Sequence, residues 1–158
     1  MTKDLAVFAK KTGVKYFMIS YTDLFGVQRA KLVPTQAIAD MQLEGAGFAG
    51  FATWLDFTPA HPDMLAVPDP SSVIQLPWKP EVAWVAANCV MEGEDVAQAP
   101  RNLLRRLIDD AGAEGMHVKT GIEAEFFLLS PDGSQISDDT ILQPSHATIS
   151  KQSCDVMI

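Results

Sequence analysis

Two glutamates stand two positions apart near the end of this 158-residue sequence, at Glu123 and Glu125. The residues around them are largely apolar and end in the run 126–129, so the segment is predicted to be a buried strand. Side chains at i and i+2 leave the same face of a strand, so both carboxylates would enter one space. Two like charges so close are costly to desolvate without a cation between them, and the nearest basic residue is Lys119. Divalent Mg²⁺ or Mn²⁺, which prefer hard oxygen ligands, would meet that requirement.

The same spacing has a second interpretation, in which Glu123 and Glu125 belong to the solvated face of a half-buried sheet. Three neighbouring features favour the metal site. Gly121 permits close approach of a second backbone, the apolar run that follows indicates a central strand, and the amphipathic stretch before it indicates a covering helix. We therefore predict that both glutamates are metal ligands, while the solvated sheet face stays open as the alternative.

Several short motifs occur in order along nearly the whole sequence. They are YTDLFG at 21–26, KLVP at 31–34, DMLAVPDP at 63–70, LPW at 76–78, PRNLL at 100–104 and GIEAEFFL at 121–128. In order and approximate spacing, they strongly resemble the motifs of glutamine synthetases. A single glutamate pair is a weak signal, whereas an ordered set of this kind is specific to a family.

The resemblance implies an α+β fold in two parts. Residues 1–99 would form the N-terminal β-grasp domain with a short N-terminal helix, and residues 100–158 would begin the catalytic domain. A change of composition near 98–100 marks the boundary. Subunits of the family are much longer than this sequence, and its last residues carry no Gly or Pro stop signal. We therefore expect a truncated first third of such a subunit.

Local patterns predict the elements that would position these residues. In order they are a helix from Leu5 closed by Gly13, strands at 14–21 and 27–33 joined by a hairpin with Gly26 in the left-handed conformation, a helix capped by Thr35 and ended by Gly45, a tightly packed loop at 45–52, strands at 73–76 and 82–90, and an amphipathic helix from Pro100 to Gly115. Strand, hairpin, strand and helix is the order that a β-grasp requires.

The resemblance also implies an ATP-dependent ligase. The γ-carboxylate of glutamate would take the γ-phosphoryl group of ATP, and an amine, ammonia in glutamine synthetase itself, would displace phosphate from γ-glutamyl phosphate. Divalent cations would neutralise the charge of the reacting anions. By the family match, Glu123 and Glu125 each serve a different Mg²⁺ or Mn²⁺ ion. The other metal ligands, most of the nucleotide pocket and the glutamate contacts would follow Ile158, and the family implies a homo-oligomer with active sites between subunits.

One departure from the family pattern concerns the amine. Glutamine synthetases usually have Phe-Asp-Gly-Ser-Ser where this sequence has FAGFA at 48–52. The usual Asp belongs to a loop that the β-grasp domain lends to the neighbouring active site, where it helps to bind and deprotonate ammonium. Ala49 has neither an acceptor nor a base, so Asp56 or Asp63 would have to replace it. Alternatively the nucleophile is methylamine or a larger amine, as in the type III or γ-glutamylmethylamide-forming group that this loop resembles.

Two further hypotheses come from other classes of protein: a non-catalytic β-grasp fragment that only contacts other subunits, and a small independent metal-binding module. Composition favours a cytoplasmic protein, since no apolar run approaches a membrane span and the start of the sequence lacks a signal peptide. The net charge of −8 argues against nucleic-acid binding. Cys89 and Cys154 match no metal or redox motif, so we expect free thiols.

Overall fold

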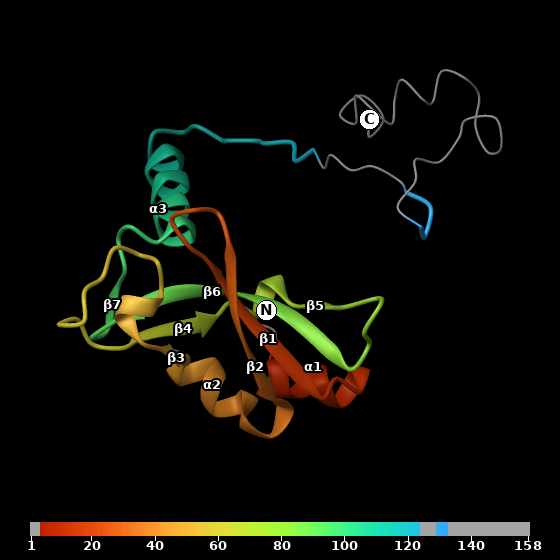
Figure 1. Ribbon diagram of the computed structural model, residues 1–158. Helices are drawn as coiled ribbons and strands as arrows, with labels where there is room; N and C mark the ends of the chain where they lie inside the picture. The colour runs from red at the N-terminus through yellow and green to blue at the C-terminus, as the bar shows by residue number, and fades with distance from the viewer. Residues whose placement is uncertain (1–3, 124–128, 133–158) are drawn as a thin grey trace, which may run out of the picture. The chain divides into compact units, whose positions relative to one another are not determined.

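The chain forms a mixed β-sheet with helices in the computed structural model, which describes residues 4–123 and 129–132 (Figure 1). The chain divides into two units, Met1–His117 and Val118–Ile158. The helices and strands of the described residues are α1 (Leu5–Thr12), β1 (Tyr16–Thr22), β2 (Gln28–Pro34), η1 (Thr35–Ala37), α2 (Ile38–Glu44), β3 (Ala46–Phe48), η2 (Gly50–Ala52), β4 (Met64–Pro68), η3 (Pro70–Ser72), β5 (Ile74–Gln75), β6 (Val82–Met91), β7 (Glu94–Asp95) and α3 (Pro100–Ala113). Across these described ranges no helix has the length and apolar character needed to cross a membrane.

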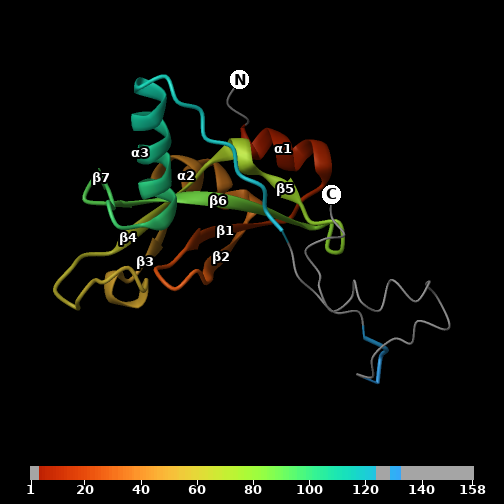
Figure 2. The ribbon, with the colours of Figure 1, turned by 90° about the horizontal axis from the view of Figure 1, so that it is seen from above.

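The sheet has the strand order β2-β1-β6-β4-β3, and the short strands β5 and β7 also pair with β6. β1 and β6 run parallel, whereas β2 pairs with β1, and β4 with both β6 and β3, in the antiparallel sense. Figure 1 shows α1 and α2 together on one side of the sheet, with α3 on the other side, and Figure 2 gives the same molecule from above. A hairpin whose first strand lies parallel to a later strand, with helices on one face, is the predicted β-grasp arrangement. The prediction of an α+β fold is confirmed.

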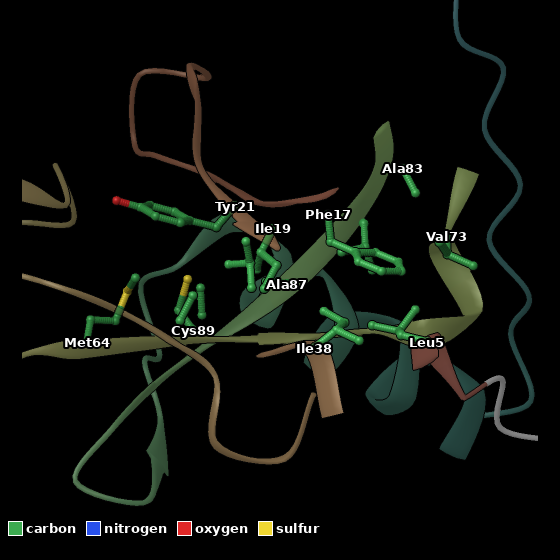
Figure 3. Packing of buried hydrophobic residues seen from close by; sticks show 14 of the residues in the cluster. Leu5, Phe17, Ile19, Tyr21, Ile38, Met64, Val73, Ala83, Ala87 and Cys89 are labelled. Carbon is green, nitrogen blue, oxygen red and sulfur yellow. The ribbon is translucent and has the colours of Figure 1, made fainter. Parts of the chain in front are cut away.

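Alternation along β1 decides which face of the sheet carries the core. Phe17 and Ile19 lie on the same face and pack in one cluster with Leu5 of α1 and Ile38 of α2; none of the four has exposed surface. Figure 3 shows these side chains in the cluster to which Ala87 of β6 also belongs. Burying a large apolar side chain contributes about 1.5–3 kcal/mol relative to leaving it exposed. The core therefore holds the β1–β2 hairpin, both helices and the central strand together.

Several predicted elements are confirmed. α1 ends at Gly13, whose φ is 76°, and Asp4 caps the start of the helix by accepting two backbone N–H groups of the first turn. The β1–β2 hairpin turns through Gly26 at φ 79°. α3 begins with Pro100 at its first position, as predicted.

Other details differ from the sequence-based expectation. Thr35 does not cap a helix: α2 begins at Ile38 after a 3₁₀ turn, and the Thr35 hydroxyl instead donates to the Val14 carbonyl at 2.8 Å. Strands β3 and β4 were not predicted, because β3 lies in the glycine-rich stretch 45–52 and β4 in a proline-rich stretch where Pro68 ends it. Their pairing with each other and with β6 outweighs their weak local propensity.

Candidate functional site

The predicted metal ligands lie in the second unit. Residues 118–123 form no strand, so that part of the strand prediction is wrong. A strand requires a hydrogen-bonded neighbour, and among the described residues of this unit Leu129 alone takes part in an isolated bridge while 118–123 pair with no strand. Glu123 is exposed, and Glu125 lies outside the described residues. Within the ranges that the structure describes, no group of three or more His, Cys, Asp or Glu side chains could hold a metal ion. Metal binding by Glu123 and Glu125 therefore stays a prediction.

The loop after β3 carries the positions predicted to meet the amine. Ala49 is exposed at its start. Gly50 is buried so close to Pro62 that a Cβ would stand 2.4 Å from the Pro62 carbonyl oxygen, which only glycine avoids. Thr53 is fully buried, and its hydroxyl donates to the Gly50 carbonyl at 2.6 Å. The loop is therefore closely packed at its base, as the glycine-rich sequence predicted.

Three successive carbonyl groups of this loop accept hydrogen bonds from other segments. The bonds run from the Tyr21 hydroxyl to Thr53 at 3.1 Å, from the Leu24 N–H to Trp54 at 3.3 Å and from the Gln98 side chain to Leu55 at 2.9 Å. Burial raises the pKa of Tyr21 to about 12, so its hydroxyl keeps the proton that it donates. The loop is thus attached at both the β1–β2 hairpin and the segment before α3.

Trp54 and Asp56 have left-handed φ values of 57° and 64°, which is rare for a bulky residue such as Trp54 and better tolerated by Asp56. This conformation costs an L residue about 1–2 kcal/mol. Leu55 between them has no exposed surface, so it anchors the turn while its two neighbours are exposed. Such backbone strain persists where the surrounding contacts over-determine it, and it is frequent at functional sites.

Side chains of the loop and of the β1–β2 hairpin line a cavity of about 330 Å³, which we call the aromatic pocket. Its lining residues are Leu24, Phe25, Phe51, Trp54, Asp56 and Phe57. Phe25 and Trp54 meet edge to face with their ring centroids 5.8 Å apart. Aromatic faces beside a carboxylate form a surface suited to an organic cation. Phe25, Phe51 and Trp54 are each more than half exposed, which is also typical of a surface that meets another protein.

A buried carboxylate lies beside this pocket. Asp23 has no exposed surface. One of its oxygens accepts the N–H groups of Phe25 and Val27, at 2.9 and 3.0 Å, and the other accepts Arg29 Nε at 2.8 Å. Burial by itself would raise the pKa of Asp23, but Arg29 and the two N–H groups outweigh it and hold the pKa below its ordinary value. The Arg29 guanidinium also lies over the Trp54 ring, 5.4 Å from the centroid.

The structure separates the two acidic residues that were predicted to replace the missing Asp. Asp56 lines the aromatic pocket, whereas Asp63 is exposed immediately before β4 and does not line it. Ala49 is also absent from the lining. Sequence reasoning did not identify Asp23 or Arg29 as site residues. The available signal was an Asp at the start of a glycine-containing hairpin, which is a common turn pattern with many structural roles.

α3, predicted to open the catalytic domain, is attached to β6 through polar groups in its first turn. Asn102 is 4% exposed; its side chain accepts the Cys89 N–H at 3.2 Å and donates to the carbonyls of Cys89 and Val96, at 2.6 and 3.2 Å. Next to it, Arg101 forms an ion pair with Asp69 at 2.5 Å. Further along α3 the apolar side chains are about half exposed, so polar contacts dominate this attachment.

Comparison with known proteins agrees with the fold and with the order of these elements. Residues 97–156 match the family model of the glutamine synthetase catalytic domain. The chain is 69% identical over 148 residues to a glutamine synthetase of Rhizobium leguminosarum bv. phaseoli. The aligned stretch covers 92% of this chain and 34% of that protein. It is 35% identical over 124 residues to a glutamate–methylamine ligase of Methyloversatilis universalis, covering 77% of this chain and 28% of that protein.

A solved structure described as a GmaS/ADP complex superimposes with a TM-score of 0.81 and 52% identity, over 96% of this chain and 36% of that one. The fold and these similarities define a ligase-family module built on a β-grasp sheet. The chain belongs to the glutamine synthetase family. Its relatives also include members of the family's divergent amide-forming group. It spans about a third of the length of the relatives that it matches. The boundary at residues 99 and 100 stays a prediction.

Proposed function

We propose that this chain is part of an ATP-dependent ligase that joins an amine to the γ-carboxylate of glutamate through γ-glutamyl phosphate. The observation that most supports this function is the 69% identity to a glutamine synthetase across 92% of the chain. Glu123 and Glu125 also fall within the stretch 97–156 that matches the catalytic-domain model. Ammonia is the leading amine, so glutamine is the leading product.

Glu123 and Glu125 are proposed to hold Mg²⁺ or Mn²⁺ in this enzyme. The chemistry of the donor set fits, because carboxylate oxygens are the ligands that these hard cations prefer. Glu123 is exposed, so its carboxylate is accessible to a cation. A cation held there would neutralise phosphate charge as the glutamate carboxylate approaches ATP. The remaining ligands would come from the rest of the complete subunit.

The aromatic pocket is proposed to face the amine-binding part of an active site in a homo-oligomer. Asp56 is the proposed acceptor for the ammonium group, in place of the Asp that Ala49 replaces, because it lines the pocket and Asp63 does not. An ammonium group must lose a proton before its nitrogen can attack, and an exposed carboxylate that accepts a hydrogen bond from it can take that proton.

A second candidate is a γ-glutamylamide ligase that uses methylamine or a larger amine. The aromatic lining favours it, because rings bind alkylammonium groups through both apolar contact and cation–π attraction, whereas ammonium offers no apolar surface. The methylamine-ligase and GmaS relatives are consistent with this candidate. Their lower identity, compared with the glutamine synthetase relative, leaves ammonia as the leading amine.

Phosphate release by the complete subunit tests both candidates. With glutamate, ATP and Mg²⁺ present, kcat/KM should be measured for ammonium, methylamine and isopropylamine. Preference for ammonium supports glutamine synthesis, and preference for an alkylamine supports the second candidate. Phosphate release that does not depend on glutamate, or no release with any of the amines, would contradict the ligase proposal and favour the non-catalytic fragment.

A further inference from the structure

The Asp23 carboxylate makes more contacts than its hairpin turn requires. Its first oxygen alone accepts both turn N–H groups, those of Phe25 and Val27. A neutral Asn or Ser oxygen at this position could accept the same bonds. The second oxygen is used only for Arg29 Nε among the described contacts, at 2.8 Å. The second oxygen therefore serves Arg29, a contact that the turn itself does not require.

The planar guanidinium group of Arg29 makes two different contacts. Its Nε donates to Asp23, and the guanidinium carbon lies 5.4 Å from the centroid of the Trp54 ring. A lysine ammonium is a single point charge and cannot combine a directed bond to the carboxylate with a planar contact to a ring. The geometry of the pair thus depends on arginine.

Trp54 has a strained backbone and a side chain that is 54% exposed, so few contacts orient its ring. Within the described residues, its ring meets the edge of Phe25 and the guanidinium of Arg29. Phe25 itself belongs to the turn that Asp23 holds through its N–H bond. Both contacts to the indole therefore depend on Asp23.

We propose that Asp23 is a positioning residue of the aromatic pocket: it orients Arg29 and Phe25, which together hold the Trp54 ring where the pocket receives the amine. The inference rests on the proposed function, in which this pocket faces the amine. Asp23 and Arg29 then determine amine affinity without touching the amine, ATP or glutamate. No covalent step is assigned to either residue.

Two readouts test the proposal separately. The first readout uses the complete subunit with Trp78→Phe and Trp84→Phe, so that Trp54 is the one tryptophan left among the first 158 residues. The fluorescence of any tryptophan elsewhere in the subunit is measured in a matched Trp54→Phe sample and subtracted. Arg29→Gln and Asp23→Asn are expected to lower the fluorescence anisotropy of Trp54 and to increase its quenching by acrylamide. Arg29→Lys should behave like Arg29→Gln, because charge alone cannot restore the planar contact. Arg106→Gln on α3 is the control for loss of one positive charge.

The second readout compares the Michaelis constants for the amine, glutamate and ATP. It uses variants that keep all native tryptophans. Arg29→Gln is expected to raise KM for the preferred amine about tenfold, since a displaced binding wall weakens substrate positioning, while KM for glutamate and ATP stays within about twofold. Arg29→Gln remains informative if Asp23→Asn fails to fold, because the Arg29 side chain is 35% exposed.

Unchanged Trp54 anisotropy and quenching in Arg29→Gln would overturn the proposal. A mobile Trp54 with an unchanged amine KM would also overturn it, as would an equal rise of all three Michaelis constants. A wild-type subunit without glutamate-dependent activity would contradict the proposed function, and with it the amine role of the pocket, while the fluorescence would still decide whether Arg29 orients Trp54.

Discussion

Replacing Asn102 with alanine should loosen the attachment of α3 to the sheet. The side chain makes three hydrogen bonds, one from the Cys89 N–H and two to the carbonyls of Cys89 and Val96. All three backbone groups lie where water has little access, since Asn102 is 4% exposed, Cys89 1% and Val96 5%. Alanine would leave them without these partners and could not recruit bulk water to replace them.

The expected loss follows from the number and type of these bonds. A net contribution of about 0.5–1.5 kcal/mol per bond, combined with the cost of buried unpaired groups, predicts a loss of about 2–4 kcal/mol in the free energy of unfolding. For a domain of this size, each kcal/mol corresponds to a melting temperature lower by about 2–4 °C. Asn102→Asp should lose more, because a carboxylate would accept the Cys89 N–H but face two carbonyl oxygens.

Equilibrium unfolding of the 158-residue chain in urea, followed by tryptophan fluorescence, measures this loss. Arg106→Ala is the matched control, since it is exposed on the same helix and should change the free energy of unfolding by less than about 0.5 kcal/mol. A loss for Asn102→Ala that is no larger than that of the control would refute the reasoning, because it would mean that the three bonds contribute nothing net.

Four further outcomes are expected. In the complete subunit, Glu123→Ala or Glu125→Ala should abolish Mg²⁺-dependent phosphate release with an unchanged circular dichroism spectrum; activity within a few fold of wild type would exclude the metal role. Gly50→Ala should lower the free energy of unfolding by about 1–3 kcal/mol in urea, because its methyl group meets the Pro62 carbonyl; an unchanged midpoint would contradict the close packing. Because the folded-state pKa of Asp23 lies below its ordinary value of 3.8, the charged carboxylate stabilises the fold above pH 3.8 and loses that effect as pH falls through the folded pKa. Wild type should therefore be more stable than Asp23→Asn at pH 7 in urea and approach it in acid, and a constant difference would argue against the ion pair. The 158-residue chain by itself should show no glutamate-dependent ATP hydrolysis in a phosphate assay, since in-line transfer needs nucleotide, metals and glutamate together, and measurable turnover would contradict this expectation.

Predictions from the sequence succeeded where the signal lies within a few residues. Gly13 and Gly26 adopt the positive φ values that their places at a helix end and a hairpin turn require, and Pro100 begins α3. The amphipathic pattern of α3 also predicted a helix correctly. It did not predict that polar contacts of Asn102 would attach the helix to β6, because an apolar stripe does not identify the surface that covers it.

Predictions failed or stayed untested where pairing partners decide the outcome. Residues 118–123 have the composition of a strand but form none, since a strand depends on its neighbours in a sheet. β3 and β4 show the reverse case, with weak local propensity and firm pairing to each other and to β6. The same dependence explains why Glu123 could be identified as a candidate ligand while the geometry of its site could not.

The sequence by itself determined the family and the α+β class, because ordered motifs, turn glycines and the N-terminal proline of α3 are all local features of the chain. Only the tertiary structure showed that Asp23, Arg29 and Trp54 form one connected group, and that Asp56 lines the aromatic pocket while Asp63 does not. Residues about 25–30 positions apart meet there through the packing of the β1–β2 hairpin against the loop after β3. That packing buries the Asp23 carboxylate, holds the Trp54 backbone in the left-handed conformation and forms the shared cavity. No window of neighbouring residues encodes these properties.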